Sequence, residues 1–257
     1  MSLIKTDDEI KIMREGGKIL SQALAAAVRA VRPGVGIREL DEIAEASLRA
    51  AGAVPSFKGF CGSKEDPPFP STLCVSIGPE VVHGSADRNI KLKAGEIVSL
   101  DIGCEYKGLF TDMAVSVAVG EISPAAKKLM EVTREALFAG VRAVKSGGDV
   151  RDISSAVENY IKPHGYGIVM ALVGHGVGHA VHESPNIPNF ISRKARSFPL
   201  KPGMCLAIEP MIAMKSGEVV TADDGWTVIT KDGSLAAHFE MTVVVTKKGH
   251  EILTLLP

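Results

Sequence analysis

The clearest structural signal in the sequence is GEIVSLDIGCEYKGLFTDMAVSVAVG, residues 95–120. It consists of two apolar runs on either side of Lys107-Gly108, a dipeptide suited to a turn. We therefore expect two antiparallel strands joined by a tight turn. If that turn has two residues, Tyr106 pairs with Leu109, and the register of the whole hairpin follows from this pair.

Two carboxylates meet on one face of this predicted hairpin. Counting outward from the turn, Gly103 lies opposite Asp112. Asp101 is two residues from Gly103 and shares its face, because side chains alternate along a strand. Asp101 and Asp112 then become diagonal neighbours, ~7–8 Å apart at the backbone. This spacing suits two side chains that converge on one or two ions, although a different turn length would change the register.

Acids embedded in apolar strand segments occur at two further places. Glu209 lies in CLAIEPMIA and Glu240 lies in AAHFEMTVVVT. A buried carboxylate without a partner is costly, so it pairs with a cation, becomes protonated or binds a metal. A salt bridge remains the alternative for any one of the four acids. Four such acids occur, and no Lys or Arg lies within the same apolar segments to pair with them. This favours a metal site.

Four carboxylates supply mainly oxygen ligands, and this limits which metal ions the site would bind. Structural zinc prefers thiolate and imidazole ligands, whereas carboxylates suit Mn, Fe or Co and can bridge two ions. Two ions that share a hydroxide are well suited to hydrolysing an amide. The stretch GHGVGHAVHESP, residues 174–185, adds three histidines whose spacing alone leaves metal binding, catalysis and a plain loop open: His175, His179 and His182.

Around the hairpin the sequence alternates pairs of helices with strands. Thr6 and Glu9 form a capping box, Ser123-Pro124 is a second helix start, and Asp149 can cap a further helix. We expect helices over about 7–31, 37–51, 124–145 and 150–161, and strands near 73–77, 81–82, 168–173, 204–213 and 239–246. The fold class is α+β, with helices segregated from a largely antiparallel sheet. Because the sequence contains no linker, we expect one domain, residues 1–257.

The composition excludes several classes of function. The chain has 257 residues and a net charge of -1, so no general electrostatic attraction draws it to nucleic acid or to an anionic membrane. No apolar run reaches the ~18 residues of a membrane span, and the charged N-terminus lacks the apolar core of a signal peptide. The cysteines form no C-x-x-C pair and are expected to be free thiols: Cys61, Cys74, Cys104 and Cys205. We expect a cytoplasmic protein.

Taken together, the motifs resemble those of the type I methionine aminopeptidases, which are pita-bread metallopeptidases, over nearly the whole chain. The resemblance rests on CVSIGPEVVHG, SLDIG followed by TDMA, GHGVGHAVHESP, IEPM, FEMTVVVT and DDGWTVITKDGSLAAHFE. It implies the pita-bread fold, in which two pseudo-symmetric halves share a curved antiparallel sheet covered by helices. It also implies removal of the N-terminal methionine from nascent proteins and peptides whose second residue is small.

The resemblance further implies a cofactor of two divalent metal ions: Co, Mn or Fe, with Zn and Ni as alternatives. Asp112 and Glu240 would bridge the two ions. Asp101 would complete one of them, and His175 with Glu209 would complete the other. The matching positions in this chain are found in the motifs quoted above.

The same resemblance gives roles to further residues. Glu209 would act as a catalytic residue that accepts a proton from the attacking water. His182 would hydrogen-bond the scissile carbonyl or its oxyanion, and His83 would contact the substrate backbone and assist proton transfer to the leaving amine. His179 matches no role in the family, and we expect it to be a loop residue or one that supports the metal ligands without binding metal itself. An apolar pocket for the methionine side chain would be lined by Cys74, Trp226, Phe57 and Phe69.

The chain departs from the family pattern in one place near the ligands. It has FEMT where FEHT is common. Met241 lies on the strand face opposite to Glu240, so we expect that it does not coordinate metal. His238 lies two residues before Glu240 and shares its face, which makes it a candidate hydrogen-bond donor to the ligands.

Two other functions were weighed. Xaa-Pro dipeptidases and aminopeptidase P usually carry an extra N-terminal domain, for which the position of Asp101 leaves no room. A catalytically inactive pita-bread adaptor would be expected to lose metal ligands, and this chain retains all five. We therefore expect a monomeric enzyme that acts on the N-termini of nascent polypeptides. Transient association with the ribosome stays open.

Overall fold

The central hairpin has the predicted register. Strands β4 (Ile97–Tyr106) and β5 (Leu109–Ala118) pair along their whole length, with Gly103 opposite Asp112. The two turn residues have positive φ values of 52° and 82°, as a tight hairpin turn requires. The prediction is confirmed by the computed structural model, which describes residues 2–62, 67–192 and 196–255.

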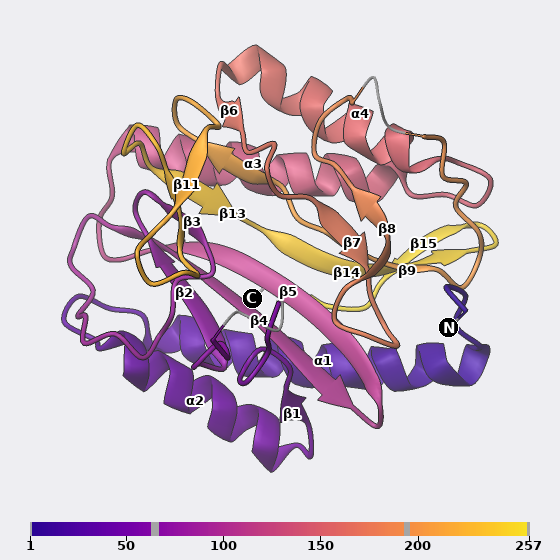
Figure 1. Cartoon of the computed structure of the whole chain (residues 1–257), viewed down its shortest axis with the longest axis horizontal. Coiled ribbons are helices and arrows are strands. Elements are labelled where there is room, and N and C mark those ends of the chain that lie inside the picture. Colours follow the sequence, from indigo (N-terminus) through magenta and orange to yellow (C-terminus); the bar gives the residue numbers. More distant parts are fainter. Residues whose placement is uncertain (1, 63–66, 193–195, 256–257) are drawn as a thin grey trace.

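This hairpin lies in the middle of a nine-stranded sheet (Figure 1). The path through the sheet is β1-β4-β5-β14-β9-β7-β8, with β2 paired to β4 and β15 paired to β14. These strands are β1 (Val54–Pro55), β2 (Leu73–Ile77), β7 (Gly174–Gly176), β8 (Glu183–Ile187), β9 (Cys205–Ile208), β14 (Glu240–Thr246) and β15 (Gly249–Ile252). Every pairing in the sheet is antiparallel, as predicted.

Two small antiparallel sheets extend this arrangement. One has the order β13-β10-β6 and the other β11-β12-β3. Their strands are β3 (Glu80–Val82), β6 (Gly167–Ile168), β10 (Met211–Ala213), β11 (Val219–Thr221), β12 (Val228–Thr230) and β13 (Ala236–His238). Because β10 and β13 directly follow and precede strands of the large sheet, the chain changes sheets at these two points.

Four helices flank the strands in two pairs. They are α1 (Asp7–Ala30), α2 (Ile37–Ala50), α3 (Pro124–Ala143) and α4 (Val150–Ile161), followed by the short 3₁₀ helix η1 (Lys162–His164). The predicted caps are present: Thr6 forms the capping box with Glu9, the Ser123 side chain accepts the Ala126 amide in the first turn of α3, and the Asp149 side chain accepts the Arg151 amide in the first turn of α4. Figure 1 shows α1 and α2 along one side of the strands and α3 and α4 along the other.

One of the longer predicted strands is broken, and another, which is present within one residue of its predicted start, begins directly after a break in strand pairing. The expected strand over 204–213 is divided into β9 and β10 at Glu209-Pro210, because proline has no N–H to continue a ladder. The expected strand over 239–246 begins at Glu240 and is separated from β13 by Phe239. At both breaks the chain passes from the large sheet to a small one.

The predicted strand over 168–173 is largely wrong. Only Ile168 of that range is in a strand, at the end of β6, and pairing resumes at Gly174 in β7. The segment between them leaves the β13-β10-β6 sheet and crosses to the large sheet, where β7 pairs with β9. The apolar run therefore belongs to a partly exposed crossing, in which Met170 is 59% exposed, rather than to a continuous strand.

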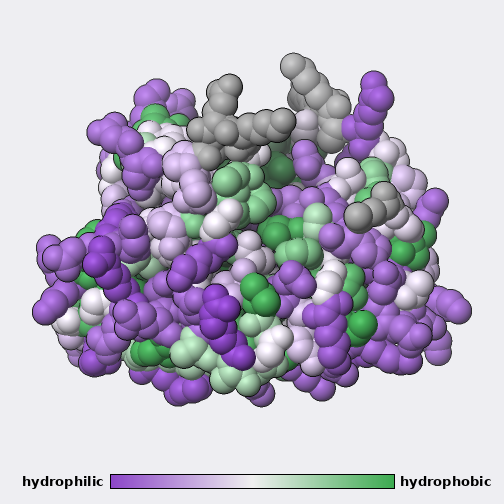
Figure 2. Space-filling view, turned by 60° about the horizontal axis from the view of Figure 1, so that its bottom comes forward, coloured by the Kyte–Doolittle hydropathy of each residue, from purple (hydrophilic) through white to green (hydrophobic). Residues whose placement is uncertain are grey.

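The outer surface is mainly hydrophilic. On the face drawn in Figure 2, polar residues predominate and hydrophobic residues form small separate patches. Among the described residues, no helix is both long enough and apolar enough to cross a membrane. The described cysteines are all free thiols, as predicted.

Candidate active site

One cavity collects every residue that the sequence analysis assigned to metal binding, catalysis or the methionine pocket. Its lining consists of Phe57, Phe60, Phe69, Cys74, His83, Asp101, Asp112, His175, His182, Glu209, Trp226 and Glu240. Phe60 was not predicted. It lies three residues after Phe57 in the same loop. This short spacing between two phenylalanines was the signal that could have placed Phe60 in the cavity lining with Phe57.

The paired strands bring three of the acids side by side. Ala114 on β5 pairs with Asp101 on one side and with Glu240 on the other. Asp112 lies two residues before Ala114 and shares its face. The Thr242 hydroxyl accepts the Asp112 amide at 3.0 Å and donates to the Asp112 carbonyl at 2.8 Å. This buried pair of hydrogen bonds fixes β5 against β14 next to the carboxylates.

Glu209 reaches the cavity because its strand ends there. The side-chain amide of Asn189 donates to the Glu209 carbonyl at 2.9 Å and satisfies a backbone group that the break leaves free. The Glu209 carboxylate lies 3.4 Å from Nε2 of His175. The break at Pro210 thus places the fourth acid opposite the hairpin.

His175 is held in the tautomer that a metal ligand requires. Its Nδ1 lies 2.9 Å from the Gly176 carbonyl oxygen, which can only accept, so Nδ1 carries the proton and Nε2 is free. Burial lowers the pKa of His175 to about 4. At neutral pH the ring is therefore uncharged, with its free nitrogen directed toward Glu209.

The four acids are buried without cationic partners among the described Lys and Arg residues. Asp101, Asp112 and Glu240 are 7%, 3% and 2% exposed. Burial raises the pKa of Asp101 to about 7, and burial and the neighbouring acids raise the pKa values of Asp112, Glu209 and Glu240 well above normal. One oxygen of Asp101, of Asp112 and of Glu240 is buried with no hydrogen-bond partner. Such a concentration of unpaired carboxylate oxygen is stable in ionised form only with a cation.

The ligand atoms are close enough for a cation to bridge them. Donor atoms of Asp112, His175 and Glu240 lie within 4.8 Å of one another, and so do donor atoms of Glu209, His238 and Glu240. Glu240 belongs to both groups. The donor set of carboxylates with one or two imidazoles therefore fits divalent metal ions.

Comparison with known proteins places the chain in a family. The profile of metallopeptidase family M24 matches residues 11–247. A methionine aminopeptidase of Clostridium perfringens is 44% identical over 256 residues, which is 100% of both chains. The chain belongs to metallopeptidase family M24, among its methionine aminopeptidases. Metallopeptidases of this family act with divalent metal ions, which agrees with the donor set.

The fold of this M24 peptidase is the predicted pita-bread fold. A crystal structure of the methionine aminopeptidase from Thermotoga maritima superposes with a TM-score of 0.92 at 38% identity and covers 98% of each chain. A prolidase from Pyrococcus furiosus superposes with a TM-score of 0.78 at 26% identity, but the match covers only 66% of that chain. The match in length and fold thus favours the methionine enzymes over the proline-specific relatives.

Two more histidines of the M24 peptidase face the cavity. His83 follows β3 with a φ of 60°, a left-handed conformation that costs energy for a non-glycine residue and that is enriched at functional sites. Burial lowers the pKa of His83 to about 4. His182 contacts His175 edge to face at a ring distance of 4.4 Å and contacts Phe60 at 5.5 Å. Loss of water around its ring lowers the pKa of His182 as well. Both rings are neutral at pH 7 and can donate one hydrogen bond.

The opposite end of the cavity is apolar. Phe69 packs edge to face on Trp226 with ring centroids 5.4 Å apart. Cys74 on β2 lies across from Asp101 on β4 and is buried. Burial raises the pKa of the Cys74 thiol, so it is uncharged and serves as a soft apolar surface.

His238 is the unexplained group beside the acids. It is 1% exposed, and neither ring nitrogen has a hydrogen-bond partner among the described residues. Its Nε2 lies 3.7 Å from Glu209 and 4.0 Å from Glu240. Met241, in contrast, packs in the main hydrophobic core on the other side of β14, as predicted. His238 therefore faces the carboxylates and Met241 does not.

The raised pKa values predict how the metal-free M24 peptidase responds to pH. In the folded chain Asp101 and its neighbours keep protons that the unfolded chain has lost, so their contribution to stability falls as pH rises through about 7. The buried histidines, whose pKa values are lowered, act in the opposite direction only below about pH 6.5. Between about pH 6.5 and 8.5 the melting temperature of chelator-treated protein should therefore fall, and it should fall less in Asp101→Asn. A melting temperature that rises over this interval would contradict the assignment.

Proposed function

We propose that this M24 peptidase removes the N-terminal methionine from nascent polypeptides with a small second residue, working in the cytoplasm as one catalytic domain. One observation supports it most. A single cavity joins a set of unpaired carboxylates, two neutral histidines and an apolar end lined by Phe69 and Trp226. The polar part suits peptide hydrolysis and the apolar part suits a methionine side chain.

The proposed metal ligands are the five residues predicted from the sequence: Asp101, Asp112, His175, Glu209 and Glu240. By the family resemblance Asp112 and Glu240 would each be shared by two ions, and Glu240 belongs to both clusters of donor atoms. Mn, Fe or Co would be the preferred metals, with Zn or Ni as alternatives. When bound, such ions supply an activated water and polarise the carbonyl that is attacked. Their positive charge also compensates the buried carboxylates, which otherwise remain protonated.

The chain's own residues would then handle protons and hold the substrate. Glu209 is the proposed proton acceptor, because its carboxylate lines the cavity beside Nε2 of His175 and because burial raises its pKa, which makes it a stronger base than an exposed glutamate. Neutral His182 would donate a hydrogen bond to the carbonyl oxygen of the first residue, whose negative charge grows during attack. His83, on the same cavity wall as Cys74, would hydrogen-bond the peptide backbone and help the proton reach the leaving amine.

The pocket explains why methionine and a small second residue are expected. Phe57, Phe60 and Phe69 surround the apolar end together with Trp226 and Cys74. An unbranched, polarisable thioether packs well against aromatic rings. The second residue of a bound peptide would lie near His83 and His182, and the family resemblance implies that only a small side chain is accepted there.

The direct test is release of free methionine. Protein stripped of metal is offered the peptides Met-Ala-Ser and Ala-Pro-Ser before and after addition of Mn or Co. We expect methionine release from the first peptide only, and only with metal. Cleavage of Ala-Pro-Ser instead would assign the chain to the proline-specific class. If neither peptide is cleaved although metal binds, the adaptor function is favoured.

A second experiment asks what His238 does. We expect His238→Ala to weaken metal affinity about 10- to 100-fold, as loss of a group that orients metal ligands does elsewhere. Met241→Leu is the matched control, since it alters the neighbouring residue on the core face and should leave metal affinity unchanged. Both are measured by titrating metal-free protein with Mn. Equal affinities in wild type and His238→Ala would remove His238 from the site.

A further inference from the structure

The loop that carries His182 is held in place by contacts with distant parts of the chain. This histidine loop, residues 177–182, joins β7 to β8 and lies at the cavity mouth. Its side facing the hairpin is tied to β5, where the Phe110 amide donates to the Gly178 carbonyl at 2.8 Å. The His182 side chain itself makes only ring contacts with His175 and Phe60 among the described residues. Its position therefore depends on what holds the loop.

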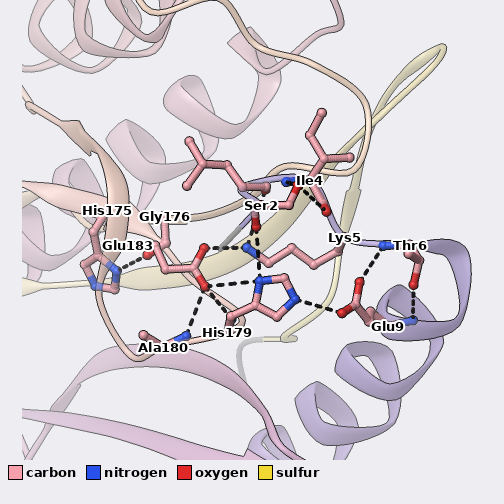
Figure 3. Close-up of polar contacts among 11 residues, drawn as sticks. Ser2, Ile4, Lys5, Thr6, Glu9, His175, Gly176, His179, Ala180 and Glu183 are labelled. Atoms are coloured by element: carbon pink, nitrogen blue, oxygen red, sulfur yellow. Dashed lines mark hydrogen bonds and ion pairs between the residues drawn. The ribbon is translucent and has the colours of Figure 1, made fainter.

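The N-terminal segment, residues 2–9, reaches across and pairs with the end of this loop (Figure 3). The Lys5 ammonium lies 2.5 Å from Oε2 of Glu183, the residue directly after His182. Their side chains are 1% and 10% exposed, so the ion pair is buried. The two residues are 178 positions apart in the sequence. A buried charge pair of this kind requires both partners, because either charge alone is costly.

Glu183 connects Lys5 to the backbone of the histidine loop. Its second oxygen, Oε1, accepts the backbone amides of His179 and of Ala180, the latter at 3.0 Å. One carboxylate thus closes the loop on itself and at the same time binds Lys5. The stem of Lys5 crosses directly over Gly178, where a Cβ would lie 2.2 Å from its Cε. Only glycine fits beneath the lysine.

A second tether runs from the loop to the start of α1. The ring of His179 lies 2.7 Å from Glu9 through Nε2 and 3.1 Å from the Ser2 carbonyl through Nδ1. The other Glu9 oxygen accepts the Thr6 amide at 2.7 Å in the capping box. These hydrogen bonds, with the Thr6 amide first, hold the pKa of Glu9 at about 2, so its carboxylate is ionised. His179 lies in the loop, as expected, and its ring joins the loop to the helix cap.

We propose that the N-terminal segment is a clamp that sets the position of His182, with Lys5 and Glu183 as its positioning residues. Neither residue lines the cavity, so they act only through the loop. Because β8 begins at Glu183, the clamp fixes the backbone on the C-terminal side of His182, while β7 fixes it on the His175 side. This inference rests on the proposed function of His182 and adds the device that holds its ring.

The test compares kcat, KM and the state of the His182 ring in matched variants. Lys5→Met removes the cation and leaves the Glu183 carboxylate buried without its partner. The double variant Lys5→Met/Glu183→Gln also removes this negative charge, so that no unpaired buried charge opposes folding. Lys5→Arg should restore the pair. Arg14→Met is the control, because Arg14 pairs with Glu251 and joins α1 to β15 without contact to the loop. The His182 ring is followed by NMR of histidine-labelled, metal-free protein.

We expect the Lys5→Met variants to lose about 10-fold or more in kcat with KM changed much less, since small misplacement of a catalytic group is costly. The His182 signals should shift in these variants and not in Arg14→Met. On a His182→Ala background, Lys5→Met should cause little further loss, because its effect runs through the missing ring.

Wild-type kcat and unshifted His182 signals in the folded double variant would overturn the clamp. So would a loss on the His182→Ala background as large as in the wild type. If wild-type protein releases no methionine, the proposed function fails, while the NMR signals still show whether Lys5 positions His182.

Discussion

Replacing Asp112 by asparagine should reduce methionine release by at least about 10³-fold and abolish the stabilisation that metal provides. Asp112 is 3% exposed and has an oxygen with no hydrogen-bond partner, so the amide cannot be rescued by solvent. Asparagine keeps the shape but loses the charge that would bridge two ions. Bound metal stabilises a protein by mass action, so its loss is visible as a missing rise in melting temperature.

The same substitution should make the metal-free protein more stable. Burial, followed by the charge of Asp101, raises the pKa of Asp112, and burial together with the neighbouring acids, Asp112 among them, raises those of Glu209 and Glu240. Removing one acid from the group relieves this repulsion. Asp8→Asn is the matched control, since Asp8 is an exposed acid on α1. If Asp112→Asn still gained melting temperature from Mn as wild type does, the metal assignment would be wrong.

The second large effect is expected from the cavity histidines. His182→Ala and His83→Ala should each lower kcat about 10²- to 10³-fold, the usual loss when a donor to a developing oxyanion or a proton-transfer group is removed. Metal binding should persist, because neither residue is a proposed ligand. The measurements are kcat at saturating metal and the rise in melting temperature on adding Mn.

His164→Ala provides the comparison for these variants. His164 lies in η1, is exposed, and packs on Tyr160 and Tyr166 far from the cavity lining. Its loss should change neither kcat nor metal binding. An unchanged kcat in His182→Ala with metal bound would assign the oxyanion contact to another group, and the same result in His83→Ala would remove it from the mechanism.

Much of the fold followed from local signals. The helix starts at Thr6, Ser123 and Asp149 are short-range hydrogen-bond patterns, and they occur as predicted. The hairpin register depended only on a two-residue turn, and it brought Asp101 and Asp112 to one face. Such features are readable because the interacting groups are only a few residues apart in the chain.

The features that were missed depend on distant parts of the chain. Pro210 is a local signal for the break after Glu209, but neither it nor any residue near Phe239 indicates that the chain changes sheets there, because each switch depends on which distant strands are joined. The crossing after Ile168 looked like a strand for the same reason. Strands such as β8, β11 and β12 have three to five residues, which is too short for apolar periodicity in the sequence to mark them. The pairing of Lys5 with Glu183 had no local signal at all.

The sequence predicted which residues form the candidate site, but it did not predict the hydrogen bonds and distances between them. The motifs marked the residues that line the cavity, except Phe60. Only the three-dimensional contacts show that the ring nitrogens of His238 have no hydrogen-bond partner among the described residues, and which ring nitrogen of His175 carries the proton. Sequence patterns report which side chains are present, whereas hydrogen-bond partners depend on how the sheets pack.

Catalysis by this M24 peptidase is proposed to depend on metal held by five residues: Asp101, Asp112, His175, Glu209 and Glu240. Anomalous diffraction from crystals soaked in Mn tests it most directly. Two anomalous peaks are predicted inside the cavity, each within ~2–2.5 Å of donor atoms from this set, with Asp112 and Glu240 touching both. Peaks confined to other sites, or no peak in the cavity of protein that still releases methionine, would contradict the claim.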